Sequence, residues 1–179
     1  MSEIEVRLAH ADEYARIDEA IVEAYAHDYG PNDHPDPNRE ARVRAQHYDV
    51  WVAAEGARVL GSVTSRRIDG PSLHEGVPEN DIDVRLLGVS PSARRRGIGA
   101  LLMRRVIEHA RDAGAVAVSL KTQPFMVGAH RLYEGLGFER RPERDGLWFG
   151  DTKVLDLHAY VLPLGPLDAA AAAAADDEM

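Results

Sequence analysis

A long amphipathic helix between two apolar strands constrains the fold of this chain more than any other feature. The helix is expected from residue 97 to residue 113 and ends at Gly114. Its apolar residues lie on one face: Ile98, Leu101, Leu102, Val106 and Ala110. Strands are expected at residues 81–89 and 116–120, and the second is apolar enough to be buried on both faces. A strand, a helix and a strand in this order form a right-handed crossover, so the chain should contain a parallel strand pair.

The rest of the chain supplies further strands and helices around this unit. Strands are expected over residues 3–8, 50–54, 58–67 and 152–162, and helices over residues 11–26, 38–47 and 126–136. The turn Glu55-Gly56 joins the second and third strands, and Asn38 caps the second helix. Three prolines and a glycine make residues 28–38 a loop. This mixed order is typical of an α/β fold with a central sheet.

Length and composition place these elements in one domain. The chain has 179 residues, too few for two ordinary domains, and no cysteine, which excludes disulfides and a cysteine nucleophile. Its first five residues carry two acids and no base, and no stretch is apolar enough to span a membrane, so we expect a cytoplasmic protein without a membrane partner. We expect one domain over residues 1–164 and a flexible, acidic, alanine-rich tail over residues 165–179.

Three consecutive arginines at the start of the long helix indicate an anion site. The net charge is −9, but residues 94–111 hold six arginines and a single acid, Glu108. Residues 94–100 read Arg-Arg-Arg-Gly-Ile-Gly-Ala and put three cations at the positive end of the helix dipole, where each costs roughly 0.3 to 1 kcal/mol. A phosphate held by the helix start and the arginines would reverse this cost, and the glycines let it approach the backbone. The alternative is a solvated arginine run in an ordinary turn.

The same turn departs from the commoner nucleotide-binding motifs. No lysine follows its glycines, as a P-loop requires. Leu102 stands where a Rossmann fingerprint needs a third glycine, and Ser119 and Lys121 stand where it needs an acid. A nucleic-acid-binding domain that uses residues 94–111 is a further alternative, but the negative net charge argues against a nucleic-acid partner.

Two motifs resemble the GNAT superfamily of acyl-CoA-dependent N-acyltransferases. The signature [RQ]-x-x-G-x-[GA] is matched by Arg94-x-x-Gly97-x-Gly99, behind Leu86-Leu87-Gly88-Val89. The stretch Leu132-Tyr133-Glu134-Gly135-Leu136-Gly137-Phe138 is similar to the family's L-Y-x-x-x-G-F. The resemblance covers about residues 81–140. It implies a single domain with a central mixed, mostly antiparallel sheet, flanked by helices, in which a parallel strand pair splays apart.

The resemblance also implies a site for acetyl-CoA between the splayed strands. Leu87 and Val89 would offer main-chain contacts to the pantetheine arm. Gly88 suits a bulge in this strand, or a place where another backbone approaches closely. The pyrophosphate would be held by Arg94, Arg95, Arg96, Gly97, Ile98, Gly99 and Ala100. Tyr133 stands where the family commonly protonates the departing thiolate, and a phenol held near the sulfur suits that task. The alternative for Tyr133 is a core tyrosine that packs between helix and sheet.

The attacking amine must lose a proton, so a base should lie near it. Asp83 is the first candidate because it stands on the bulged strand where many relatives carry an acid, and Asp81 shares its face. The alternative is a solvated or ion-paired carboxylate. Met126 stands where many relatives carry an asparagine, which keeps open a non-catalytic acyl-CoA sensor that acts through a partner.

The resemblance therefore implies an N-acetyltransferase that moves an acetyl group from acetyl-CoA to a primary amine by direct attack in a ternary complex. The acceptor is a small molecule or a peptide, and a homodimer is compatible with the sequence. The eight histidines lack metal-ligand spacing, so no metal is implied. In such a fold two groups of residues border the acceptor pocket and mildly favour a cationic amine: His27, Asp28, Asp33, His34 and Asp36 in one loop, and His74 and Glu75 in another.

Overall fold

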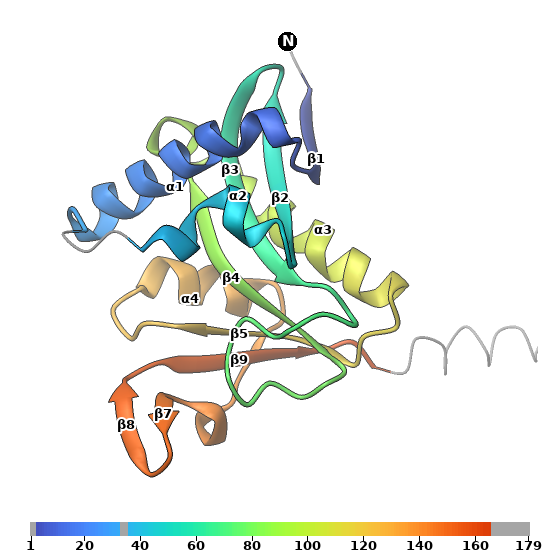
Figure 1. The fold of residues 1–179 in the computed structure, drawn as a ribbon, viewed down its shortest axis with the longest axis vertical. Coiled ribbons are helices and arrows are strands. Elements are labelled where there is room, and N and C mark those ends of the chain that lie inside the picture. Colours follow the sequence, from blue (N-terminus) through green and yellow to red (C-terminus); the bar gives the residue numbers. More distant parts are fainter. Residues whose placement is uncertain (1–2, 33–35, 166–179) are drawn as a thin grey trace, which may run out of the picture.

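The computed structural model describes residues 3–32 and 36–165, and a seven-stranded sheet forms its centre (Figure 1). The strand order is β1-β2-β3-β4-β5-β9-β6. These strands are β1 (Ile4–Leu8), β2 (Tyr48–Glu55), β3 (Arg58–Arg66), β4 (Asp81–Val89), β5 (Ala117–Thr122), β6 (Glu139–Arg140) and β9 (His158–Pro163). Strands β4 and β5 are parallel and the other neighbours are antiparallel, which confirms the predicted mixed sheet.

Helices cover both faces of this sheet. They are α1 (Tyr14–Tyr29), α2 (Ala41–Arg44), α3 (Ile98–Asp112) and α4 (Val127–Gly135), with short 3-10 turns η1 (Ala11–Glu13), η2 (Pro37–Arg39), η3 (Pro91–Ala93) and η4 (Pro142–Arg144). Ile17 and Ile21 of α1 pack in one apolar cluster, which also contains Val52 of β2. Leu102 and Val106 of α3 belong to a second cluster. Two separate cores therefore hold three layers together.

The predicted crossover from β4 through α3 to β5 is present. Gly97 precedes α3 in the left-handed conformation, with φ 72°, and Gly114 follows it with φ 78°. Strand β5 is almost entirely buried, as its apolar sequence indicates. The β4–β5 pairing runs from Asp81 opposite Ala117 to Val84 opposite Leu120 and goes no further. The last five residues of β4 therefore have no β5 neighbour, and the two strands splay apart.

The bulge in β4 lies two residues before the position that the sequence suggested. Ser62 of β3 pairs with Gly88 and Thr64 pairs with Arg85, so β4 carries one extra residue between these pairs. Leu86 adopts φ 61° there. Gly88 is needed for another reason, because a Cβ at this position would lie 2.7 Å from Cδ1 of Ile21 in α1. The glycine marks a close approach of a helix to the sheet.

Three expected boundaries are wrong. The helix expected over residues 38–47 is split into η2 and the four-residue α2, because Glu40 between them is extended, and Asp36 rather than Asn38 is the cap of η2. Helix α1 continues to Tyr29, into the expected loop. The strand expected over residues 152–162 is two strands: β8 (Thr152–Leu155), which forms a separate hairpin with β7 (Leu147–Phe149), and β9.

The expected tail lies almost wholly in residues 166–179, outside the described residues. Within the residues that the structure describes, no helix combines the length and apolar character that a membrane span requires.

Candidate active site

The splay between β4 and β5 opens a cavity of about 750 Å³. Its walls come from α1, the free end of β4, the turn before α3, the end of β5, α4 and the β7–β8 hairpin. The lining includes eight of the nine predicted acetyl-CoA residues: Leu87, Val89, Arg94, Arg95, Gly97, Ile98, Gly99 and Ala100. Tyr133 lines the same cavity. The fold thus gathers residues from both sequence motifs around one space.

The three arginines of the turn have three different environments. Arg94 forms two hydrogen bonds to the carboxylate of Asp28 in α1, at 2.9 and 3.2 Å. Arg96 does not line the cavity and pairs with Glu55 at the end of β2, at 2.8 Å. Arg95 is exposed, lines the cavity and has no acidic partner among the described residues. Two of the three charges therefore have acidic partners within the chain, and Arg95 remains without one among the described residues.

Two residues of the turn adopt the left-handed backbone conformation. They are Arg95, with φ 63°, and Gly97, with φ 72°. The first helical bond of α3 runs from Leu101 to Gly97, and the preceding N–H groups have no partner within the helix. Arg95, the amides and the helix dipole together favour an anion at this end of the cavity.

Gly99 serves packing as well as access to the backbone. A Cβ at this position would lie 3.2 Å from Cδ2 of Leu132, so the glycine lets the start of α3 lie close to α4. The two family-like motifs therefore touch each other in the structure.

The free edge of β4 is the second element of the site. The carbonyl oxygen of Leu87 accepts a hydrogen bond from the hydroxyl of Tyr25, at 3.1 Å, and that of Val89 accepts one from Nε of Arg94, at 3.0 Å. Both carbonyls thus have partners inside the chain. An extended ligand could still pair with the remaining backbone groups on this edge, since β5 does not pair with residues 85–89.

Tyr133 lies in α4 with 7% of its surface exposed. Its ring packs against Phe138, at a centroid distance of 5.8 Å, and against Tyr160, at 6.1 Å. Burial raises the pKa of this phenol above its usual value, so the hydroxyl stays protonated at neutral pH. No other described residue forms a hydrogen bond with the hydroxyl, which leaves it available as a donor. The two interpretations of Tyr133 are compatible, since a core ring carries a hydroxyl at the cavity.

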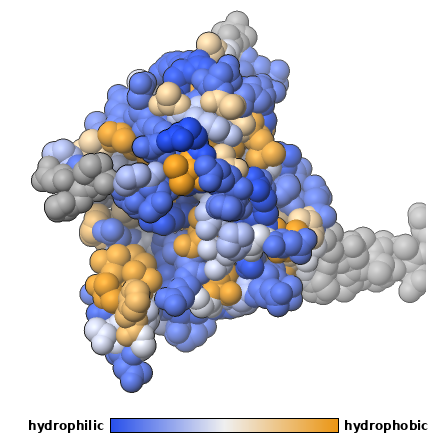
Figure 2. Space-filling view, viewed as in Figure 1, coloured by the Kyte–Doolittle hydropathy of each residue, from blue (hydrophilic) through white to orange (hydrophobic). Residues whose placement is uncertain are grey.

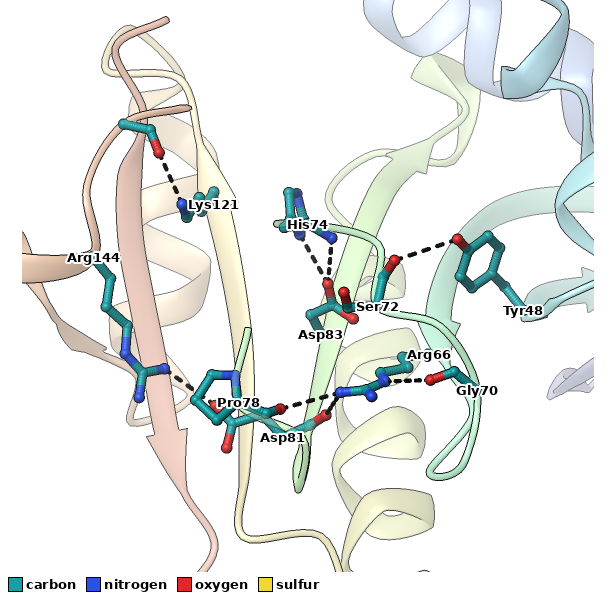
Figure 3. A network of polar contacts seen from close by, with 11 residues as sticks. Tyr48, Arg66, Gly70, Ser72, His74, Pro78, Asp81, Asp83, Lys121 and Arg144 are labelled. Carbon is teal, nitrogen blue, oxygen red and sulfur yellow. Dashed lines mark hydrogen bonds and ion pairs between the residues drawn. The ribbon is translucent and has the colours of Figure 1, made fainter. Parts of the chain in front are cut away.

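Asp83 does not face the cavity, although the sequence made it the first candidate for a base. Its side chain has no exposed surface, and His74 lies over it (Figure 3). Oδ2 of Asp83 accepts a hydrogen bond from the backbone N–H of His74 at 2.7 Å and lies 3.2 Å from Nδ1 of its ring. His74 lines the cavity in front of Asp83. Sequence reasoning put His74 at the acceptor pocket without a role, because the contact joins residues nine positions apart through an irregular loop.

A smaller cavity of about 380 Å³ adjoins the first and shares five lining residues with it: His74, Glu75, Leu120, Lys121 and Leu147. Nζ of Lys121 donates to the carbonyl of Gly146 at 2.8 Å, and burial lowers the pKa of this lysine. Arg144, which lines the smaller cavity, pairs with Asp81 at 3.1 Å. His74 therefore lines two adjacent spaces, and both of them hold further charged side chains.

The β7–β8 hairpin adds an apolar wall. Figure 2 shows hydrophobic residues gathered over β8, and four of the exposed ones belong to this hairpin: Trp148, Phe149, Val154 and Leu155. Leu147, Leu155 and Leu157 line the larger cavity. The predicted strand over residues 152–162 gave no indication of this wall.

Met126 also lines the larger cavity, and its sulfur accepts a hydrogen bond from the hydroxyl of Thr122 at 3.5 Å. Of the acceptor-loop residues, Asp28, His74 and Glu75 line the larger cavity, His27 pairs with Asp28, and Asp36 caps η2. Asp33 and His34 lie outside the described residues. Across residues 3–32 and 36–165, no three histidine or acidic side chains cluster in a way that could hold a metal ion.

The known proteins that this chain resembles in sequence include two that are named N-acetyltransferases. Over 116 residues the chain is 36% identical to N-acetyltransferase 8 of Mus musculus, which covers 63% of this chain and 49% of the mouse protein. It is 35% identical over 100 residues to N-acetyltransferase 8F1 of Rattus norvegicus, covering 55% of this chain and 42% of the rat protein. The chain thus spans less than half of the length of either relative.

Solved structures share the fold. A GNAT family acetyltransferase from Staphylococcus aureus superimposes with a TM-score of 0.71 at 16% identity, covering 90% of this chain and 99% of the other. A GNAT family acetyltransferase from Brucella melitensis, solved in complex with acetyl-CoA, superimposes with a TM-score of 0.62 at 19% identity, covering 93% and 91%. Residues 14–138 match the acetyltransferase (GNAT) family, and this match includes both motifs and most of the cavity wall. This chain belongs to the GNAT acetyltransferase family.

Proposed function

We propose that this protein is an acetyl-CoA-dependent N-acetyltransferase, in which acetyl-CoA lies between β4 and β5 and the acceptor is a primary amine of a small molecule or peptide. One observation carries the proposal: the free edge of β4 leads into the turn before α3, where Arg95 lines the cavity beside the unpaired N–H groups that begin the helix. An extended arm attached to a diphosphate fits that pair of features, because the arm needs backbone partners and the diphosphate needs donors.

The residues present fit acetyl-CoA in charge and in size. Arg95 lines the anion end without an acidic partner in the described parts of the chain, and the cavity of about 750 Å³ is within the range of small-ligand sites. When bound, acetyl-CoA supplies an activated acetyl group as a thioester. The chain's own residues then have three tasks, which are to fix the diphosphate, to align the arm along β4 and to move two protons.

Tyr133 is the proposed donor to the leaving sulfur. The raised pKa of its phenol keeps the proton on oxygen until negative charge develops beside it. Direct attack by the amine needs no nucleophile from the protein, in keeping with a chain that has no cysteine.

A non-catalytic acyl-CoA sensor is the second candidate, and Met126 favours it. The thioether stands on the cavity wall where many relatives carry an asparagine, and it supplies no strong donor to a ligand. Both candidates use the same cavity, so binding of acetyl-CoA does not separate them.

Turnover separates the enzyme from the sensor. Release of CoA thiol from acetyl-CoA is measured with a panel of primary amines that includes amino acids, polyamines, arylalkylamines and short peptides. We expect thiol release that depends on at least one amine and is matched by an acetylated product in mass spectra. Stabilisation of the protein by acetyl-CoA without any amine-dependent release would support the sensor, and neither effect would contradict both.

A further inference from the structure

We infer that His74 accepts the proton of the attacking amine and that Asp83 is a positioning residue that orients the His74 imidazole. The inference rests on the proposed function and names the base that it requires. It replaces Asp83 in the role that the sequence suggested, because the geometry separates that carboxylate from the cavity.

The exposure of the two side chains decides that His74 is the base and Asp83 the positioning residue. The side chain of Asp83 has no exposed surface and is absent from the lining of both cavities, whereas the side chain of His74 keeps 14% of its surface exposed and lines both. A base must reach the proton that it removes, directly or through one water molecule. Of these two groups, His74 alone meets that condition in the described structure.

The contacts of Asp83 are directed at His74. Its Oδ2 receives the backbone N–H of His74 and lies within hydrogen-bond distance of ring Nδ1, while Oδ1 is buried and has no partner among residues 3–32 and 36–165. Every hydrogen bond of this carboxylate with the described residues thus goes to one histidine. A buried carboxylate oxygen without a partner is costly, and a catalytic role is one of the reasons for which native proteins keep such an atom.

This arrangement selects one form of the imidazole. An ionised Asp83 can only accept, so Nδ1 of His74 carries the proton and Nε2 has a free lone pair. In other catalytic sites a buried carboxylate that accepts a hydrogen bond from one ring nitrogen of a histidine fixes the tautomer and the ring orientation in the same way. The pair is held by different elements, since Asp83 stands in the buried first half of β4 and His74 in the loop between β3 and β4. The rigid strand therefore positions a residue from an irregular segment.

The proton balance is complete with the residues named. The amine nitrogen forms a bond to the acetyl carbon while the carbon–sulfur bond breaks. Nε2 of His74 takes the proton that leaves the nitrogen, and the hydroxyl of Tyr133 donates to the departing sulfur. Solvent then restores both side chains, so the products are the amide and the free CoA thiol.

Charged and titratable groups of both signs line the two cavities around His74. On the elements beside it they are Glu75 in the same loop, Arg85 on β4, Lys121 on β5, Tyr133 on α4, Tyr160 on β9, and Glu143, Arg144 and Asp145 in and next to η4. Towards α1 and the turn before α3 they are Tyr25, Asp28, Tyr29, Arg39, Arg94 and Arg95. Figure 3 shows Lys121 on the strand that faces His74. Asp83 contacts the ring from the side away from these cavities.

The test compares His74→Gln and Asp83→Asn with a matched control, His109→Gln. His109 also lies near an aspartate, with Nε2 3.6 Å from Oδ2 of Asp49, but it lines neither cavity. With any amine that the wild type acetylates, we expect His74→Gln to lower kcat roughly 10²- to 10⁴-fold at pH 7. This loss should shrink as pH rises, because the amine then loses its proton to solvent. Asp83→Asn should lower kcat less, and His109→Gln should leave it unchanged.

Measurements of acetyl-CoA binding and of the His74 tautomer distinguish a failure of this inference from a failure of the proposed function. The Kd of acetyl-CoA should be unchanged in all three variants, since none of these residues belongs to the diphosphate or arm site. Nitrogen NMR of the wild-type histidines should show the proton of His74 on Nδ1. An Nε2-protonated His74, or wild-type kcat and pH profile in His74→Gln, would overturn the inference. No amine-dependent turnover by the wild type would instead contradict the proposed function, and the tautomer would still decide whether Asp83 orients His74.

Discussion

The hydroxyl of Tyr133 can be removed without disturbing the packing of its ring. The ring lies between Phe138 and Tyr160 in the core, while the hydroxyl has no hydrogen-bond partner in the described parts of the chain. We therefore expect Tyr133→Phe to lower kcat about 100-fold, as removal of a general acid does, with little change in thermal stability. Thiol-release kinetics and a melting curve on the same sample measure both quantities. Unchanged kcat with an active amine would exclude Tyr133 as the donor.

Glu13 is a second residue whose environment gives a defined prediction. Two hydrogen bonds from Arg7, at 2.8 and 2.9 Å, and one from the backbone of His10 lower the pKa of this carboxyl to about 2. A carboxyl with a depressed folded-state pKa adds stability above its unfolded value of about 4.3, and this stability is lost as pH falls toward 2. We expect Glu13→Gln to cost about 1 to 3 kcal/mol at pH 7 and much less at pH 2.5.

The control for this prediction is Glu19→Gln, which changes an exposed acid of α1 with no ion pair among the described residues. Urea unfolding at pH 7, 4 and 2.5 compares the two variants with the wild type. Equal pH dependence of stability in all three proteins would show that the Arg7 pair contributes nothing.

The sequence predicted which residues line the site better than it predicted the role of each residue. Both motifs identified residues of the cavity, because each motif is a short stretch whose spacing carries its geometry. The pair of His74 and Asp83 joins a loop to a strand, and no periodicity in the sequence marks it. The pairing of Arg94 with Asp28 and of Arg96 with Glu55 depends likewise on contacts across the fold.

At the scale of elements, the turn before α3 separates two arginines that the sequence treats alike. Arg95 lines the cavity and Arg96 points to Glu55. Arg95→Ala should therefore weaken acetyl-CoA binding about 10-fold, as loss of a charged hydrogen bond at a partly exposed site does, whereas Arg96→Ala should change Kd less than about 3-fold. Calorimetry at low ionic strength measures both values. Equal losses in the two variants would mean that general charge, and no specific contact, attracts the ligand.

Close packing of β3 on β4 gives a prediction for Gly61. A Cβ at this position would lie 2.8 Å from the backbone oxygen of Gly88 and 3.3 Å from side chains of Ile98 and Leu102. Gly61→Ala should destabilise the protein by about 1 to 3 kcal/mol through overpacking. Gly128→Ala in α4 is the control, because a Cβ there meets nothing within 4 Å and should stabilise the protein by about 0.5 to 1 kcal/mol. Equal stability of both variants in urea unfolding would contradict this account.

Elements with strong periodicity were predictable and short irregular ones were not. Strands β1 to β5 and helices α1, α3 and α4 follow from alternation and helical spacing in the sequence. The division between β8 and β9 was missed, because apolar residues continue through both and the hairpin with β7 depends on a turn at Gly150. Gly88 indicated a bulge or a close approach, and the structure shows a close approach, but the sequence position does not reveal that α1 is the element that approaches.

At the scale of the whole molecule, the order of elements predicted the central sheet and its parallel pair. The crossover through α3 requires that pair, and the pairing of β4 with β5 ends at Val84 opposite Leu120. The cavity then follows from the splay, since β4 and β5 part directly in front of the turn before α3. The β7–β8 wall and the second cavity lie at the other end of this space, where the chain is irregular and the sequence carries little pattern.

The most direct test of acetyl-CoA binding between β4 and β5 is a titration of ¹⁵N-labelled protein with acetyl-CoA, followed by amide chemical shifts. We expect the largest changes in residues 85–89 and 94–100, which form the free edge of β4 and the turn before α3, with saturation at one ligand per chain. An unchanged spectrum at millimolar acetyl-CoA, or changes confined to residues that line only the smaller cavity, would contradict the account.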